Sequence, residues 1–169
     1  ISTVPRTGSM WTNNVTREIF NLKKLKVLPI SQLTSDEEWL NYYQYNVLFD
    51  NTQSNRYVLK IHGKLTKTPP RSKIVTTIRN PYDLCASYHQ FMKSDLAKSI
   101  TVAESIISFL DHYKNLSSEI LIIKYEDIET QPEKLIKKLA SYCELSLSDD
   151  EISLICNKYK KKEIKKIID

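Results

Sequence analysis

The nine residues TVPRTGSMW, 3–11, carry the clearest fold signal in the chain. A β-prone run, 1–5, leads into them, and apolar residues recur at helical spacing from Val15 onward. Between the two lies Gly8, one of only two glycines, and glycine permits a positive φ and the close approach of another group to the backbone. A tight loop between a strand and a helix directs backbone N–H groups into a concavity at the helix N-terminus. We therefore predict an anion-binding loop here.

The side chains of this loop fit the same chemistry. Arg6 adds a permanent positive charge, and Thr7 and Ser9 add hydroxyl donors. The loop is not a Walker A sequence, because the pattern G-x-x-x-x-G-K-[ST] is absent. A turn followed by a helix cap explains Gly8 and Ser9 about equally well. Arg6 taken together with Trp11 favours the anion site.

Three more β-prone runs alternate with helical patterns along the chain. They cover residues 57–62, 73–79 and 119–125. The last two are nearly continuous in Val, Ile and Leu, as in strands buried on both faces. Capping boxes or first-turn prolines predict helix starts, at Ser35 with Glu38, Pro81, Thr101 with Glu104, Pro132, and Ser148 with Glu151. Residues 25–33 and 63–71 are expected to be irregular loops. The alternation predicts an α/β fold, a three-layer sandwich with a central parallel β-sheet flanked by helices, in a single domain over 1–169.

Polar residues stand where the predicted strands end. Ligands of an open parallel sheet bind at the carboxyl ends of its strands. These ends are the loop 5–8, His62, Arg79 and Tyr125. Lys60 precedes His62 by two residues and so faces the same side of an extended strand. A single histidine or strand-end arginine is most often structural or a surface residue. The convergence of groups suited to anions and proton transfer predicts a ligand site.

Composition bounds the partners and the compartment. The net charge of +5 favours anionic partners, but much of the excess lies in NKYKKKEIKK, 157–166, a pattern typical of a solvated helix face rather than of nucleic-acid binding. No apolar run is long enough to span a membrane, and no signal peptide is visible. The three cysteines fit no metal-ligand spacing and indicate reduced thiols.

We expect a cytoplasmic protein without metal, nucleic-acid or membrane partners, and leave its oligomeric state open. The chain begins without Met inside a strand-like run, and we therefore expect that the domain is truncated, at one end or at both.

Four motifs in a fixed order resemble those of the sulfotransferases that use 3′-phosphoadenosine 5′-phosphosulfate (PAPS). They are PRTGSMW at 5–11, KIH at 60–62, IRNPYDLCASY at 78–88 and IIKYEDIETQPEKLIKKLASY at 122–142. In that family the first commonly reads P-K-S-G-T-T-W, the second K-T-H, and the third R-N-P-x-D with a serine eight residues after the arginine. The fourth reads Y-E-D before a helix with an early proline. The resemblance implies a P-loop NTPase-like sulfotransferase fold, closest in motifs to the cytosolic type.

The resemblance also implies roles at the 5′ end of the nucleotide. Arg6 takes the place of the loop lysine that holds the phosphosulfate bridge and stabilises the leaving group. The positions that would wrap the 5′-phosphate are Thr7, Gly8, Ser9 and Met10. Trp11 matches the tryptophan that stacks on adenine.

The remaining matches concern the transferred group and the 3′ end. His62 matches the catalytic base, and Lys60 resembles the lysine near the sulfuryl group. Arg79 and Ser87 match the ligands of the 3′-phosphate, and Tyr125 matches a tyrosine at the adenine. A neutral imidazole can take the proton of an acceptor hydroxyl as the new bond forms. The implied reaction moves a sulfuryl group from PAPS to a hydroxyl or amine of a small molecule, and leaves adenosine 3′,5′-bisphosphate (PAP).

Departures from the family pattern leave several points open. Arg6 replaces the usual lysine, Met10 replaces a hydroxyl residue, and Gly63-Lys64 stands where Leu-Pro is usual. The late R-K-G segment has no match before Asp169. Either the lysine-rich end substitutes for it, or this is a smaller member, or the chain is truncated. The acceptor is not specified; loops 26–36 and 63–71, with a possible aromatic wall at 42–45, are expected to hold it.

Two other functions compete with sulfuryl transfer. A P-loop kinase is one, because ILIIKYED, 120–127, resembles a magnesium-binding strand that ends in an acid, although G-K-[ST] is missing. The other is a non-catalytic domain that binds PAP or another nucleotide on the same fold. Within the leading hypothesis, Glu18 is the next candidate for the base.

Overall fold

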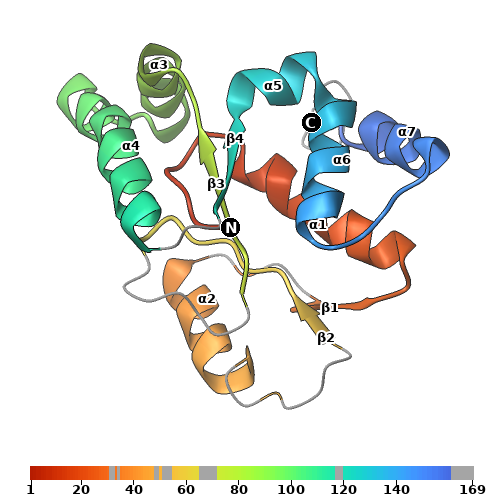
Figure 1. Ribbon diagram of the computed structural model, residues 1–169. Helices are drawn as coiled ribbons and strands as arrows, with labels where there is room; N and C mark the ends of the chain where they lie inside the picture. The colour runs from red at the N-terminus through yellow and green to blue at the C-terminus, as the bar shows by residue number, and fades with distance from the viewer. Residues whose placement is uncertain are drawn as a thin grey trace. The chain divides into compact units, whose positions relative to one another are not determined.

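The structure is a computed structural model in which helices and parallel strands alternate (Figure 1). It describes residues 1–30, 33, 35–47, 50, 55–64, 72–116 and 120–160. The chain divides into two compact units, each built from two stretches of sequence. Unit 1 comprises Ile1–Ser9 and His62–Ile128, and unit 2 comprises Met10–Ile61 and Glu129–Asp169.

A parallel pair of strands forms the centre of unit 1. β3 (Ile74–Ile78) and β4 (Ile120–Lys124) run side by side, with Ile74 opposite Ile120. Both were predicted from their apolar runs. The predicted strand over 1–5 is reduced to a single bridge residue, Ser2, whose N–H also donates to the Val75 carbonyl at 3.0 Å. Beside it, the Thr77 N–H donates to the Thr3 hydroxyl at 3.3 Å, so a side chain takes part in joining this segment to β3.

Two helices pack beside this pair and against each other, α3 (Pro81–Met92) and α4 (Leu96–Leu116) (Figure 1). α3 begins as predicted, with proline in its first turn and the Asn80 side chain accepting from the Tyr82 N–H at 2.9 Å. The buried core of the unit consists of Val4, Ile74, Leu84, Ala103, Ile106, Phe109 and Tyr113.

The predicted start of α4 was wrong. Thr101 lies inside the helix, where its hydroxyl donates to the Ala97 carbonyl at 3.1 Å instead of capping. The helix begins at Leu96, and the preceding Asp95 accepts from the Lys98 N–H at 2.6 Å. The helix therefore uses Asp95, six positions upstream of Thr101, as its capping residue. The short helix α5 (Tyr125–Thr130), which follows β4 directly, was not predicted.

Unit 2 has its own parallel pair, β1 (Lys26–Leu28) and β2 (Asn55–Tyr57). The strand predicted over 57–62 is found at 55–57 instead, and the Val58 N–H adds a hydrogen bond to the Leu28 carbonyl at 3.1 Å. β1 lies inside the segment 25–33 that was expected to be irregular. Three residues are too few to show an alternating pattern.

The helices of unit 2 mostly begin where their caps predict. α1 (Ser9–Leu22) follows the glycine loop, and α2 (Asp36–Tyr42), which continues as the π-helix η1 (Tyr43–Val47), has the predicted capping box. α6 (Pro132–Tyr142) begins at its proline, and α7 (Asp149–Lys158) has the second capping box. No helix among the described residues combines the length and the apolar character needed to cross a bilayer.

The α/β class is confirmed, because every described strand pairs in parallel and helices alternate with the strands along the chain. In the described residues these strands form two separate two-stranded sheets, one in each unit. A single domain over 1–169 stays a prediction.

Candidate functional site

The glycine loop of unit 1 is a tight turn with two unusual backbone conformations. Arg6 has a φ of 68°, and Gly8 has a φ of 102°. A Cβ added at Gly8 would lie 2.6 Å from Ile128 Cδ1 and 3.3 Å from Tyr125 Cδ2. Conformation and space therefore both require glycine here, and the loop backbone lies close against Tyr125 and Ile128.

Three buried threonines tie this loop to β3. The Thr7 hydroxyl lies 2.6 Å from the Thr77 hydroxyl and 2.8 Å from the Thr3 hydroxyl, and it donates to the Val4 carbonyl at 2.6 Å. Thr3 also lies 2.7 Å from the Thr77 hydroxyl and donates to the Thr77 carbonyl at 2.8 Å. The Thr7 side chain is fully buried in this network. Any contact of Thr7 with a ligand would therefore be made by its backbone.

Two arginines meet beside the loop. Arg79 Nη1 donates to the Arg6 carbonyl at 3.2 Å, and its guanidinium lies 4.1 Å from the centre of the Tyr125 ring. The Nε of Arg79 is buried and has no hydrogen-bond partner among the described residues. Arg6 Nε donates to the Ser87 hydroxyl at 3.3 Å, and its guanidinium lies 4.0 Å from the centre of the Phe91 ring. An unsatisfied buried donor beside a second cation fits an anion that brings its own acceptor oxygens.

The electrostatics of the pair agree with this chemistry. Partial burial lowers the pKa of Arg6, the nearby charge of Arg79 lowers it further, and Tyr125 acts in the opposite direction. Neither arginine forms an ion pair with a carboxylate within the part of the chain that the structure describes. An anion bound here would relieve the repulsion between the two guanidinium groups.

His62 stands at the start of the second stretch of unit 1. Its Nδ1 lies 3.0 Å from the carbonyl oxygen of Thr3, and the ring is half-buried. If Nδ1 carries the proton, it donates to this carbonyl and Nε2 keeps a lone pair. Thr3 thus links the imidazole to the hydroxyl network that holds the loop.

The remaining predicted residues belong to unit 2. Met10 is 42% exposed, Trp11 is buried with 8% of its surface exposed, and Lys60 is half-buried. Glu18, the alternative base, accepts from Lys158 Nζ at 2.8 Å and from the Tyr159 hydroxyl at 3.2 Å. That carboxylate is therefore already engaged with two donors.

Sequence reasoning missed one neighbour of the arginines. Phe91, 63% exposed, lies under the Arg6 guanidinium. Phe91 lies four residues after Ser87 on α3, and residues at this spacing share a helix face. The spacing could therefore have predicted that Phe91 lies beside a ligand of Ser87. Glu126 accepts from the Asn80 N–H at 2.9 Å, which joins the start of α3 to the start of α5.

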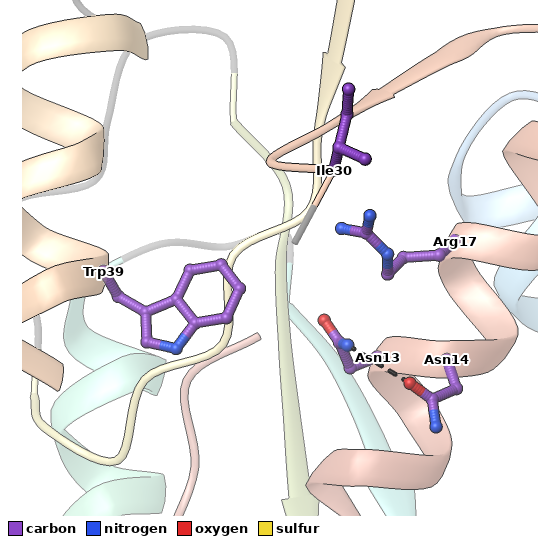
Figure 2. A pocket seen from close by; sticks show the side chains of 5 residues that line it. All are labelled: Asn13, Asn14, Arg17, Ile30 and Trp39. Atoms are coloured by element: carbon purple, nitrogen blue, oxygen red, sulfur yellow. Dashed lines mark hydrogen bonds between the residues drawn. The ribbon is translucent and has the colours of Figure 1, made fainter. Parts of the chain in front are cut away.

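A pocket of about 200 Å³ lies within unit 2 (Figure 2). It is lined by Asn13, Asn14, Arg17, Ile30 and Trp39. Asn13 Nδ2 donates to Asn14 Oδ1 at 3.4 Å, whereas Asn13 Oδ1 is buried without a partner among the described residues. Ile30 belongs to the loop 26–36 that was expected to hold the acceptor. Most of the second such loop, 65–71, lies outside the described residues.

Replacing Asn13 with leucine is expected to stabilise the protein by about 1 kcal/mol, because it removes a buried acceptor that has no donor. Urea unfolding measures the change. Asn157→Leu, at an exposed position of α7, is the control and should change the stability by less than about 0.5 kcal/mol. A loss of stability in Asn13→Leu alone would mean that the amide is satisfied, for example by water in the pocket.

Comparison with known proteins places the chain in a family. The sulfotransferase domain family matches residues 1–167. Sulfotransferase 1B1 of Mus musculus is 25% identical over 186 residues, which cover 92% of this chain and 61% of that protein. The chain thus spans about three fifths of the length of this curated relative.

Solved structures show the same fold. The crystal structure of mouse sulfotransferase SULT7A1 complexed with PAP superposes with a TM-score of 0.72 at 19% identity, covering 97% of this chain and 64% of that one. Retinol dehydratase in complex with androsterone and the inactive cofactor PAP gives a TM-score of 0.64 at 18% identity, with the same coverage. With its motifs in family order and the domain match over nearly its whole length, the chain belongs to the sulfotransferase domain family.

Proposed function

We propose that this chain binds PAPS and transfers its sulfuryl group to a hydroxyl or amine of a small-molecule acceptor. The observation that carries the proposal is the pair of guanidinium groups beside the glycine loop, without a carboxylate partner among the described residues. Arg79 holds a buried donor that an anionic oxygen would satisfy. The family match over residues 1–167 supports PAPS as the nucleotide, and the relatives solved with PAP support it further.

The nucleotide would be held at both ends. The backbone of the loop 7–10 would bind the 5′-phosphosulfate at the start of α1, where N–H groups and the helix dipole favour an anion. Arg79 and Ser87 would bind the 3′-phosphate. Trp11 and Tyr125 would lie at the adenine. Two separated anion sites would distinguish PAPS from ATP, because ATP carries no 3′-phosphate.

His62 would act as the general base. The acceptor oxygen or nitrogen forms a bond to sulfur, the bond from sulfur to the 5′-phosphate oxygen breaks, and the electron pair stays on that oxygen. The acceptor proton passes to His62 Nε2, which the contact of Nδ1 with the Thr3 carbonyl would orient. Lys60 would stabilise the sulfuryl group in transit. Positioning and charge stabilisation supply most of the rate in such transfers, by analogy with phosphoryl transfer.

Ligand-dependent thermal stability tests the nucleotide. PAP at 100 times its Kd should stabilise the chain by about 2.7 kcal/mol, because a ligand that binds only the native state shifts unfolding by mass action. ATP with magnesium should have a much smaller effect. Stabilisation by ATP with magnesium and none by PAP would contradict the proposal and favour a kinase.

Turnover tests the transfer. Incubation with PAPS and a panel of hydroxyl and amine acceptors should release PAP in amounts equal to the sulfated product. Binding of PAP without turnover of any acceptor would favour a non-catalytic domain. The cytoplasmic location and the absence of a metal requirement stay predictions.

A further inference from the structure

We propose that Arg6 binds the 3′-phosphate end of the nucleotide together with Ser87 and Arg79, and does not act at the bridging oxygen of the phosphosulfate. This inference rests on the proposed function, because it concerns the same nucleotide. It departs from the role that the loop lysine has in the family pattern, and it follows from where the arginine side chain lies.

The side-chain contacts of Arg6 point to α3. Its Nε donates to Ser87 at 3.3 Å, and its guanidinium stacks on Phe91 at 4.0 Å. Ser87 and Phe91 are four residues apart and share one face of α3. The left-handed backbone of Arg6, with a φ of 68°, is the conformation from which this side chain reaches the helix.

Arg79, the second cation at this location, indicates which kind of ligand fits. Arg79 Nη1 donates to the Arg6 carbonyl at 3.2 Å, so the two residues share one location, and Arg79 Nε is a buried donor without a partner among the described residues. Two guanidinium groups and one hydroxyl offer more donors than a single bridging oxygen can accept. A phosphate monoester has three terminal oxygens and about −1.5 to −2 charges at pH 7, which matches this donor set.

The choice of arginine over lysine agrees with this role. A planar guanidinium donates through one edge while its face stacks on an aromatic ring, whereas an ammonium is a point charge on a flexible stem. Arg6 stacks on Phe91, and Arg79 stacks on Tyr125. The two aromatic rings thus hold two like charges at one site, which a phosphate would neutralise.

Calorimetric titration with three nucleotides separates the two ends. PAP carries both phosphates, adenosine 3′-phosphate only the 3′ group, and adenosine 5′-phosphate only the 5′ group. Arg6→Gln should weaken the binding of PAP and of adenosine 3′-phosphate about tenfold, because a charge-assisted hydrogen bond is lost. The Kd for adenosine 5′-phosphate should change less than about twofold. Arg6→Lys, which keeps the charge, should show the same preference with a smaller loss.

Lys93→Gln is the matched control. Lys93 is an exposed cation of the same unit, and its φ of 49° is also positive, so the substitution removes one charge at a comparable backbone position. It should leave all three affinities unchanged. An equal or larger loss for adenosine 5′-phosphate in the Arg6 variants would overturn the inference while the proposed function stands. Failure of the unaltered protein to bind PAP would instead overturn the proposed function.

Discussion

His62→Ala is expected to lower kcat for sulfuryl transfer about 10²–10⁴-fold, the range typical of the loss of a general base. If the Nδ1 proton is donated to the Thr3 carbonyl, Nε2 of the imidazole keeps a lone pair that can take the acceptor proton. The substitution removes it without touching the arginines. Initial rates with PAPS and the best acceptor of the panel measure the loss. The Kd for PAP should stay within about twofold, because the base acts in the chemical step rather than in nucleotide binding.

His89→Ala is the matched control for this substitution. His89 is an exposed histidine of α3 in the same unit and should be replaceable without loss of rate. Full turnover in His62→Ala would reject His62 as the base. Glu18 would then need testing, although its carboxylate already accepts from Lys158 and Tyr159.

Gly8→Ala is expected to destabilise unit 1 by about 1–3 kcal/mol, the usual cost of a non-glycine residue in a sparsely populated backbone region. The φ of 102° is one cause, and the Cβ placed 2.6 Å from Ile128 Cδ1 is the other. Any shift that relieves the contact moves the loop backbone away from the position proposed to bind the 5′-phosphate. PAP affinity should therefore fall about tenfold or more, because misplaced backbone donors no longer meet the phosphate oxygens. Urea unfolding and calorimetry measure the two effects.

A double variant separates the two causes. Ile128→Val removes the Cδ1 atom that the new Cβ would meet, but it leaves the backbone conformation unchanged. If the positive φ of Gly8 causes most of the destabilisation, adding Ile128→Val does not restore the stability of the Gly8→Ala variant. Gly63→Ala is the control, because Gly63 is the other glycine, is exposed and does not have a positive φ. Wild-type stability and PAP affinity in Gly8→Ala would show that the loop does not need glycine.

Helix starts were predicted correctly where the capping residue and its partner both belong to one short sequence motif. Ser35 and Ser148 both form the reciprocal hydrogen bonds that the spacing to a glutamate predicts. Thr101 carries the same spacing and fails, because the upstream Asp95 already starts the helix. The threonine–glutamate spacing by itself does not tell whether an earlier residue has already begun the helix. The three-residue strands and α5 were too short to have a readable period.

The residues of the candidate site could be named from the ordered motifs, but their contacts could not. That Arg6 adopts a positive φ and reaches Ser87 depends on where α3 lies, 81 positions away in sequence. The Thr7 hydroxyl, expected as a ligand donor, instead belongs to a buried network whose other members come from residues 3 and 77. Such pairings arise from tertiary structure, and a single sequence read by itself carries no signal for them.

The three-threonine network has a consequence for how quickly a nucleotide can bind. A loop held by buried hydroxyls is already ordered in the unliganded protein, so binding loses little conformational entropy there. Association then requires no slow folding of the loop after the diffusional encounter. With a net charge of +5, long-range attraction of an anionic nucleotide would speed that encounter, and the association rate should fall as salt is added.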